Sequence, residues 1–394
     1  MPVYLDHAAS TPMRGEVREL LLSALAESGN PSSVHGFGQR AKLRLEEARD
    51  RIAGALGCDR AEVIFTSGGT EANNLAVFGL FEARNKSGER PIILCLGTEH
   101  HAVLEAVEFL ESERGAEVHL IPVSTSGQPD LVWLSEALKV FGDRVALVSA
   151  ILANNETGTV LDISAVTAVC KRLQIPVHSD AVAAVGHCHI NFSESGLSTM
   201  ALTGHKIGGP VGIGALIVGR SVAVKQQLRG GSQERNLRPG TQDVAGAEAL
   251  ALAVELSVAE LPQKRAHWEA LRGRLIAGVV AAVPDAVLVG ESADSPVGVR
   301  LSNIVDIVFP GCAGDSLLFM LDSAGVAISN GSACSAGVTS ASHVLVALGY
   351  NNRDAASCVR VSFGRETTEA DIDAFLAALP SAHAKAKLAG FTAL

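Results

Sequence analysis

The chain has 394 residues, of which 47% are hydrophobic and only 4% aromatic, so it can bury a large core of aliphatic side chains. Its net charge of -10 argues against nucleic acid as the main partner. The sequence contains no apolar run of about 18 residues and no signal-peptide pattern, which argues against a membrane span and predicts a cytoplasmic protein.

The cysteines are scattered along the chain. They number seven, and no two have the CxxC spacing. This distribution is typical of reduced thiols rather than of a disulfide framework or a zinc site. Cys188 lies between two histidines, but neighbouring side chains on a strand point to opposite faces, so the three would chelate a metal poorly. We therefore predict no metal site.

Hydrophobic periodicity predicts an α/β domain in the first two thirds of the chain. Residues 41–56 have apolar side chains at helical spacing. Beyond them, short runs rich in Val and Ile alternate with helical patterns, as expected for a largely parallel sheet covered by helices on both faces. The predicted strands cover residues 62–66, 91–96, 145–151, 175–180, 199–204 and 213–219.

The composition changes after this domain. Residues 243–282 are rich in Ala, Leu and Glu and predict long helices. Further on, the patterns predict strands at 285–291, 299–309 and 357–364 and helices at 314–323 and 369–379. They indicate a smaller α+β unit from about residue 260 onward.

Three loops directly follow predicted strands, where open α/β sheets bind their ligands. Residues 66–74 run through two glycines into a helix start, which suits a phosphate or an ordinary N-cap turn. Asp180 ends a strand, as a functional acid or a helix cap. Lys206 lies in an apolar, glycine-rich loop, where desolvation would make its amine nucleophilic, although most lysines are surface charges. A phosphate cradle, an acid for a pyridinium nitrogen and a Schiff-base lysine are what a pyridoxal phosphate (PLP) enzyme requires.

Ten segments extend this interpretation over nearly the whole chain. In them the sequence resembles the cysteine desulfurases of the NifS/IscS type, in the class V aminotransferase group of fold-type I PLP enzymes. The matching segments are YLDHAAST (4–11), GNPSSVHGFG (29–38), FTSGGTEANN (65–74), TEHHAVL (98–104), ANNETG (153–158), HSDAV (178–182), TGHKIGGPVGIGAL (203–216), GGSQERNLRPGT (230–241), SNGSACSAG (329–337) and VRVSFGRETTEADID (359–373).

The resemblance implies a fold and a domain division. We expect the fold-type I α/β architecture, with a large PLP-binding domain at residues 16–258 whose mostly parallel seven-stranded sheet is flanked by helices. A smaller α+β C-terminal domain at 259–394 would carry the catalytic cysteine loop. The N-terminal segment, 1–15, would pack with the small domain.

The resemblance also assigns residues to the PLP ring. Lys206 would form the Schiff base and move the α-proton of the substrate. His100 would stack on the pyridine ring and relay protons. Asp180 would keep the ring nitrogen protonated, and Asn155 would donate to the phenolate oxygen and lie near the substrate.

The remaining implied contacts hold the phosphate. They come from the Gly69 backbone and from Thr70, Thr203 and His205. Thr241 would reach across a subunit interface to the phosphate of a second copy, which implies an obligate homodimer.

For the substrate, the resemblance implies that Arg360 clamps the carboxylate of L-cysteine in a bidentate pair, with Asn30 close by. Cys334 matches the nucleophile, which would attack the substrate sulfur and leave alanine and an enzyme persulfide. The group that takes the proton from Cys334 stays open between His100 and the thiolate of the substrate.

The sequence departs from the family at Ala183, where relatives carry a glutamine that donates to the phenolate oxygen or the ring edge of PLP. We predict a weaker hold on PLP or a shifted pKa of the Schiff base. At Gly208 many relatives carry an aromatic residue. Residues 340–348 begin the next helix, and the context of Cys334 resembles the group with the longer loop.

The predicted function is an L-cysteine desulfurase that supplies sulfur to an Fe–S scaffold or to tRNA thiolation, with no membrane or nucleic acid as partner. The alternatives are a selenocysteine or cysteine sulfinate lyase, another class V transaminase-like enzyme, or a non-catalytic binding partner of a scaffold.

Overall fold

A seven-stranded sheet forms the centre of the larger unit in the computed structural model, which describes residues 2–290, 299–330 and 341–392. The five strands β7, β6, β5, β3 and β4 are parallel neighbours, whereas β8 runs antiparallel to both β2 and β7. The mostly parallel sheet is thus confirmed. In spatial order the strands are β2 (Val63–Thr66), β8 (Gly214–Val218), β7 (Thr199–Thr203), β6 (Val177–Asp180), β5 (Val145–Ser149), β3 (Ile92–Leu96) and β4 (Glu117–Ile121).

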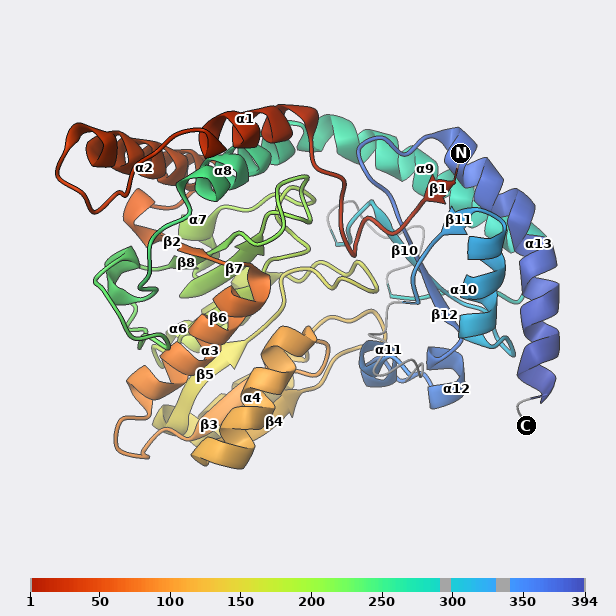
Figure 1. Cartoon of the computed structure of the whole chain (residues 1–394). Coiled ribbons are helices and arrows are strands. Elements are labelled where there is room, and N and C mark those ends of the chain that lie inside the picture. Colours follow the sequence, from red (N-terminus) through yellow and green to blue (C-terminus); the bar gives the residue numbers. More distant parts are fainter. Residues whose placement is uncertain (1, 291–298, 331–340, 393–394) are drawn as a thin grey trace.

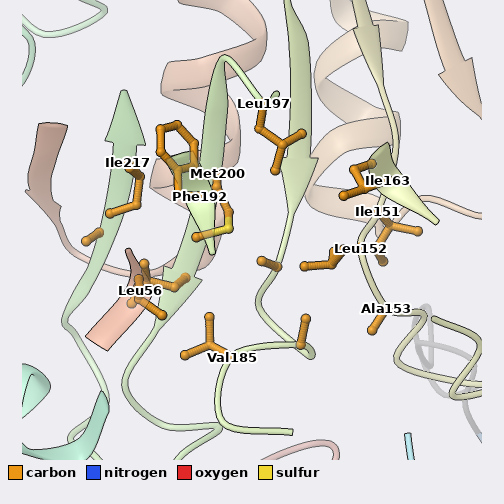
Figure 2. Packing of buried hydrophobic residues seen from close by; sticks show 14 of the residues in the cluster. Leu56, Ile151, Leu152, Ala153, Ile163, Val185, Phe192, Leu197, Met200 and Ile217 are labelled. Atoms are coloured by element: carbon orange, nitrogen blue, oxygen red, sulfur yellow. The ribbon is translucent and has the colours of Figure 1, made fainter. Parts of the chain in front are cut away.

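The helices of this unit cover both faces of the sheet (Figure 1). Along a strand, side chains alternate between the faces, so Ile92 and Leu94 join one core and Ile93 and Cys95 join another. Figure 2 shows the first core, where Met200 packs near other apolar side chains. The helices are α1 (Gly15–Leu25), α2 (Gly36–Leu56), α3 (Gly69–Arg84), α4 (His101–Arg114), α5 (Leu131–Phe141), α6 (Ile163–Lys171), α7 (Phe192–Ser195) and α8 (Val244–Ala259).

The smaller unit has its own sheet and core. Its sheet is antiparallel, with the strand order β12-β10-β9, and its core contains Trp268, Phe309 and Phe375. Helix α9 extends from the end of α8 into this unit (Figure 1). The elements are α9 (Leu261–Ala282), β9 (Val287–Leu288), β10 (Ile304–Val308), α10 (Gly314–Ser323), β11 (Val326–Ala327), α11 (His343–Ala347), α12 (Asn352–Ala355), β12 (Cys358–Ser362) and α13 (Glu369–Thr392).

The N-terminal segment joins the smaller unit. Strand β1 (Val3–Tyr4) pairs in parallel with β11, and Leu5 lies in the core of the smaller unit. The break between α8 and α9 falls at Glu260, where Arg14 binds the Glu260 carboxylate through two hydrogen bonds of 2.8 Å. The domain boundaries at 15/16 and 258/259 stay predictions. In the described part of the chain, no helix is both long and apolar enough to cross a membrane.

Candidate active site

A cavity of about 160 Å³ opens where the strands of the large sheet end. It brings together eight residues from five separate segments of the chain, which are the residues predicted to hold PLP within one subunit. They are Gly69, Thr70, His100, Asn155, Asp180, Thr203, His205 and Lys206. Ala183 also lines the cavity, at the position where the sequence departs from the family pattern.

The first wall of the cavity is the N-terminus of α3. Gly68 precedes the helix with a φ of 158°, and no side chain of the described residues caps the helix start. A Cβ on Gly69 would lie 2.6 Å from Cγ2 of Val182, so a side chain there would have to displace Val182. The first N–H groups of a helix have no partner within it and carry a partial positive charge. This end of α3, with the neighbouring Thr70 hydroxyl, therefore fits a phosphate group.

Asp180 ends strand β6 and is only 3% exposed. Its Oδ1 accepts a hydrogen bond of 2.8 Å from the backbone N–H of Val182, and its Oδ2 accepts one of 2.7 Å from Nδ2 of Asn73. Our sequence analysis missed Asn73, which lies three residues beyond Thr70 on the buried side of α3. A buried carboxylate with two donors suits the binding of a pyridinium nitrogen, which is the partner PLP would offer.

Lys206 lies in the loop between β7 and β8, and its side chain is half-buried. Its Nζ donates to the backbone oxygen of Ala8. Burial lowers the pKa of Lys206 to about 8, and the charge of Arg360 acts in the same direction, against Asp180 and Asp6. A fraction of the amine is therefore neutral near pH 7 and can act as a nucleophile or a base.

His100 is the N-cap of α4. Its Nδ1 accepts a 3.1 Å hydrogen bond from the backbone N–H of Ala102. Burial lowers the pKa of His100, which favours the neutral ring. In a neutral ring whose Nδ1 is an acceptor, the proton lies on Nε2. The nitrogen left for other contacts is thus a donor.

Arg360 lies on β12 beside the cavity rather than in its wall. Its guanidinium donates to the backbone oxygen of Asn155 at 2.9 Å and to Oδ1 of Asp6 at 2.8 Å. The side chain is buried, and its Nε has no partner among the described residues. Asp6, which sequence reasoning missed, holds part of the guanidinium that a substrate carboxylate was predicted to bind.

The described residues on either side of the segment that contains the predicted nucleophile are attached next to Asn155. Ser329 and Arg360 exchange backbone hydrogen bonds of 2.6 and 3.2 Å. Ser342 caps α11 and donates to the carboxylate of Glu156. Cys334 itself lies outside the described residues, but the chain enters and leaves its segment beside a residue of the cavity wall.

Two predicted residues lie away from the cavity. Asn30 is exposed, and its Oδ1 accepts a 2.9 Å bond from the backbone of Ser32. Thr241 is also exposed, as a residue that serves a second subunit should be. Their roles stay predictions. Within the described ranges, no three His, Cys, Asp or Glu side chains are grouped as a metal site would require.

The fold and the cavity are those expected of a fold-type I PLP enzyme, and comparison with known families agrees. The family described as "Aminotransferase class-V" matches residues 3–375 of this chain. The chain therefore belongs to the class V aminotransferase family.

Individual relatives narrow this to a group within the family. The chain is 45% identical over 391 residues to an IscS-like cysteine desulfurase of Mycobacterium tuberculosis, covering 99% of this chain and 98% of the relative. It is 38% identical over 379 residues to cysteine desulfurase IscS of Clostridium botulinum, covering 96% and 93%. A solved NifS-like protein superposes with a TM-score of 0.87 and 32% identity, over 97% and 99% of the two chains. The group is thus the cysteine desulfurases of the NifS/IscS type, which are PLP enzymes, and the predicted family and fold are confirmed.

Proposed function

We propose that this chain converts L-cysteine to L-alanine and transfers the sulfur, as a persulfide on Cys334, to an acceptor protein. The observation that carries the proposal is the cavity in which the half-buried amine of Lys206, the Asp180 carboxylate and the uncapped end of α3 lie together. The cysteine desulfurase relatives support the same activity.

The protein's own residues have separate tasks in this reaction. The N-terminus of α3, Thr203 and His205 would hold the phosphate of PLP, and Asp180 would hold its ring nitrogen. When bound, PLP supplies an electron sink for chemistry at the α-carbon of an amino acid. The neutral amine of Lys206 would take the proton from that carbon, because its pKa lies near 8.

The substrate carboxylate would bind the Arg360 guanidinium in place of Asp6, which holds one of its nitrogens through Oδ1. This exchange keeps a charge-assisted pair on a buried cation in both states. Asn155, whose backbone oxygen accepts from the same guanidinium, would keep the arginine beside the cavity.

The sulfur step balances without an external oxidant. The Cys334 thiolate attacks the substrate sulfur, so an S–S bond forms while the Cβ–S bond breaks. The electron pair of the broken bond stays on the carbon skeleton, which takes up a proton and leaves as alanine. One cysteine and one enzyme thiol thus give one alanine and one persulfide.

We further propose a homodimer, with Thr241 of each subunit at the phosphate of the other, and a cytoplasmic Fe–S scaffold or tRNA-thiolation protein as the acceptor. The exposure of Thr241 away from the cavity of its own subunit supports the dimer. The NifS/IscS-type relatives support the class of acceptor.

The test is to add L-cysteine and a thiol reductant to the PLP-loaded protein and to measure alanine and sulfide. We expect both products, and we expect Cys334→Ala to lose both while the visible absorbance of bound PLP persists. Cys58→Ala is the matched control, because burial raises the pKa of the Cys58 thiol to about 12 and makes it unreactive. Alanine formation that does not depend on Cys334 would indicate a simple lyase, and no turnover with PLP bound would indicate a binding protein.

A further inference from the structure

Three buried polar side chains lie in a row behind Asp180. Nδ2 of Asn73 is 2.7 Å from Oδ2 of Asp180, and Oδ1 of Asn73 is 3.0 Å from Nε2 of His178. Nδ1 of His178 is in turn 2.9 Å from Oγ1 of Thr199. Asn73 is 1% exposed, and His178 and Thr199 are fully buried. A buried row of this kind has no access to bulk water, so each polar atom depends on its neighbour in the row.

The charge on Asp180 fixes the direction of every hydrogen bond in the row. An ionised carboxylate only accepts, so the amide of Asn73 must present Nδ2 to it and Oδ1 to His178. Burial lowers the pKa of His178 to about 3, so its ring is neutral and carries one proton. That proton must lie on Nε2, because Asn73 Oδ1 can only accept. Nδ1 then accepts from the Thr199 hydroxyl.

A neutral Asp180 would allow the opposite direction. Its own proton could go to Asn73 Oδ1, the amide Nδ2 would then face His178, and the ring would carry its proton on Nδ1 toward Thr199. The two directions keep the same residues side by side and exchange only the places of Oδ1 and Nδ2 of Asn73. The tautomer of His178 therefore reports which state of Asp180 the row supports.

We propose that Thr199, His178 and Asn73 are positioning residues that form a one-way hydrogen-bond row and hold Asp180 as an oriented carboxylate for the ring nitrogen of the cofactor. The proposal rests on the function proposed above, in which that ring belongs to PLP. The elements that carry the row are α3, β6 and β7, and His178 and Thr199 are direct register partners in the sheet. With Val182 N–H on Oδ1 and Asn73 on Oδ2, each oxygen of Asp180 has one fixed donor, and the carboxylate lines the cavity.

Other charges act on the same carboxylate but do not orient it. Lys206 and His100 line the cavity with Asp180, and Glu99 interacts with it electrostatically, yet no hydrogen bond joins any of them to Asp180 among the described residues. The row is thus the contact that fixes the rotation of the carboxylate about its χ2 angle, together with Val182.

The first test measures the ring nitrogens of His178 by ¹⁵N NMR, in the PLP-loaded protein and after PLP is removed. We expect a neutral ring with its proton on Nε2 in both. The signal is assigned by its loss in His178→Gln or, if that variant does not fold, by its shift in Thr199→Ser. A proton on Nδ1, or a charged ring at pH 7, would overturn the proposal.

The second test compares PLP affinity in two variants of one position. His178→Phe removes the donor to Asn73 and frees its amide to turn, so we expect PLP to bind about tenfold more weakly. His178→Gln places an amide N–H near the same point and should restore most of the affinity. The control is Thr167→Val, which removes a buried hydroxyl that donates to the backbone oxygens of Ser164 and Ser195 and, among the described residues, has no hydrogen bond to a member of the row.

These outcomes separate a positioning role from a structural one. A general loss of stability would weaken PLP binding equally in His178→Phe and His178→Gln, and that result, or unchanged affinity in His178→Phe, would contradict the row. The outcome is also independent of the proposed reaction. If the wild-type protein bound PLP but made no alanine from L-cysteine, the function would fail while the NMR and affinity results still decided the role of His178.

Discussion

At Ala183 the cavity wall has a methyl group where the family pattern has a glutamine. The other side chains around it, such as Asp180 and Asn155, are those the pattern expects. The wall therefore lacks one hydrogen-bond donor but keeps its general form. A missing donor to a charged acceptor weakens binding more than a missing donor to a neutral one.

We therefore predict that Ala183→Gln binds PLP about tenfold more tightly, because the amide adds a donor at the ring edge. Equilibrium titration of the PLP-free protein, followed by the absorbance of the bound cofactor, measures this. Ala183→Leu, which adds similar bulk without a donor, is the control. Equal gains in both variants would mean that packing and not a hydrogen bond is responsible.

His100 was one of two predicted acceptors for the proton of Cys334. Its Nδ1 is occupied by the backbone of Ala102, so the neutral ring offers an N–H rather than a lone pair. A ring held in this way can donate a proton at Nε2 but must first lose it to act as a base there. In the proposed reaction, this geometry favours the substrate thiolate over His100 as the acceptor for the proton of Cys334.

The loop after Lys206 is held by the N-terminal segment. Arg14 is buried, donates to the backbone oxygen of Ile207 at 3.3 Å and pairs with Glu260 at the junction of α8 and α9. Gly208 has a φ of 80°, and a Cβ there would lie 2.7 Å from Cγ of Arg14. In this chain, both the backbone conformation and the close approach of Arg14 thus favour glycine at 208.

We predict that Gly208→Ala lowers the free energy of unfolding by about 2–4 kcal/mol, since it adds a clash to the strain of a positive φ. Gly212→Ala is the matched control, because Gly212 has a φ of 89° with open space around its Cβ position and should lose only about 1 kcal/mol. Thermal or denaturant unfolding of both variants measures the difference. Similar losses would show that the contact with Arg14 has no energetic weight.

Buried strands could be predicted from the sequence because they are continuous apolar runs, as in β5 and β8. Strand β4 was missed, since it lies at the sheet edge and its Glu117 and Leu120 are exposed. Hydrophobic periodicity carries no information on strand direction, so it could not predict that β8 runs antiparallel to its neighbours. The roles of Asn73 and His178 were missed for a related reason: each has a partner that is more than a hundred residues away in sequence and adjacent only in the fold.

At the scale of the whole molecule, burial raises the pKa values of three carboxyl groups among the described residues. Glu99 and Asp306 are raised to about 8 and Glu156 to about 7. Each of these carboxyl groups binds its proton more tightly in the folded chain than in the unfolded chain. The protein therefore loses stability as the pH rises toward and through the folded-state pKa of each group. Two of these residues connect the larger unit to the smaller one. The carboxylate of Glu156 accepts a hydrogen bond from the Ser342 hydroxyl, and the backbone oxygen of Glu99 accepts one from Nε2 of the His343 ring.

We predict that the PLP-free protein becomes less stable between pH 6.5 and 8, with the unfolding temperature falling by about 3 °C. Glu156→Gln keeps an acceptor for Ser342 but does not titrate, so it should reduce this fall. Buried histidines affect the stability of the protein below pH 6.5. In the folded protein the pKa of His178, for example, is lowered to about 3. As the pH falls, such histidines are protonated in the unfolded chain first, which lowers the stability of the folded state. Lys206, with a pKa lowered to about 8, changes the stability of the protein mainly above pH 8. A variant curve parallel to the wild-type curve would contradict the assignment to Glu156.

The sulfur that we propose Cys334 carries would connect the cavity to the acceptor, and it can be observed directly. The PLP-loaded protein is treated with L-cysteine in the absence of reductant, its thiols are alkylated, and the peptide that contains Cys334 is analysed by mass spectrometry. We predict that this peptide gains the mass of one sulfur atom, that a reductant removes it, and that Lys206→Ala, which lacks the amine for the α-proton, never gains it. An unmodified Cys334 in protein that is forming alanine would contradict sulfur transfer to this residue.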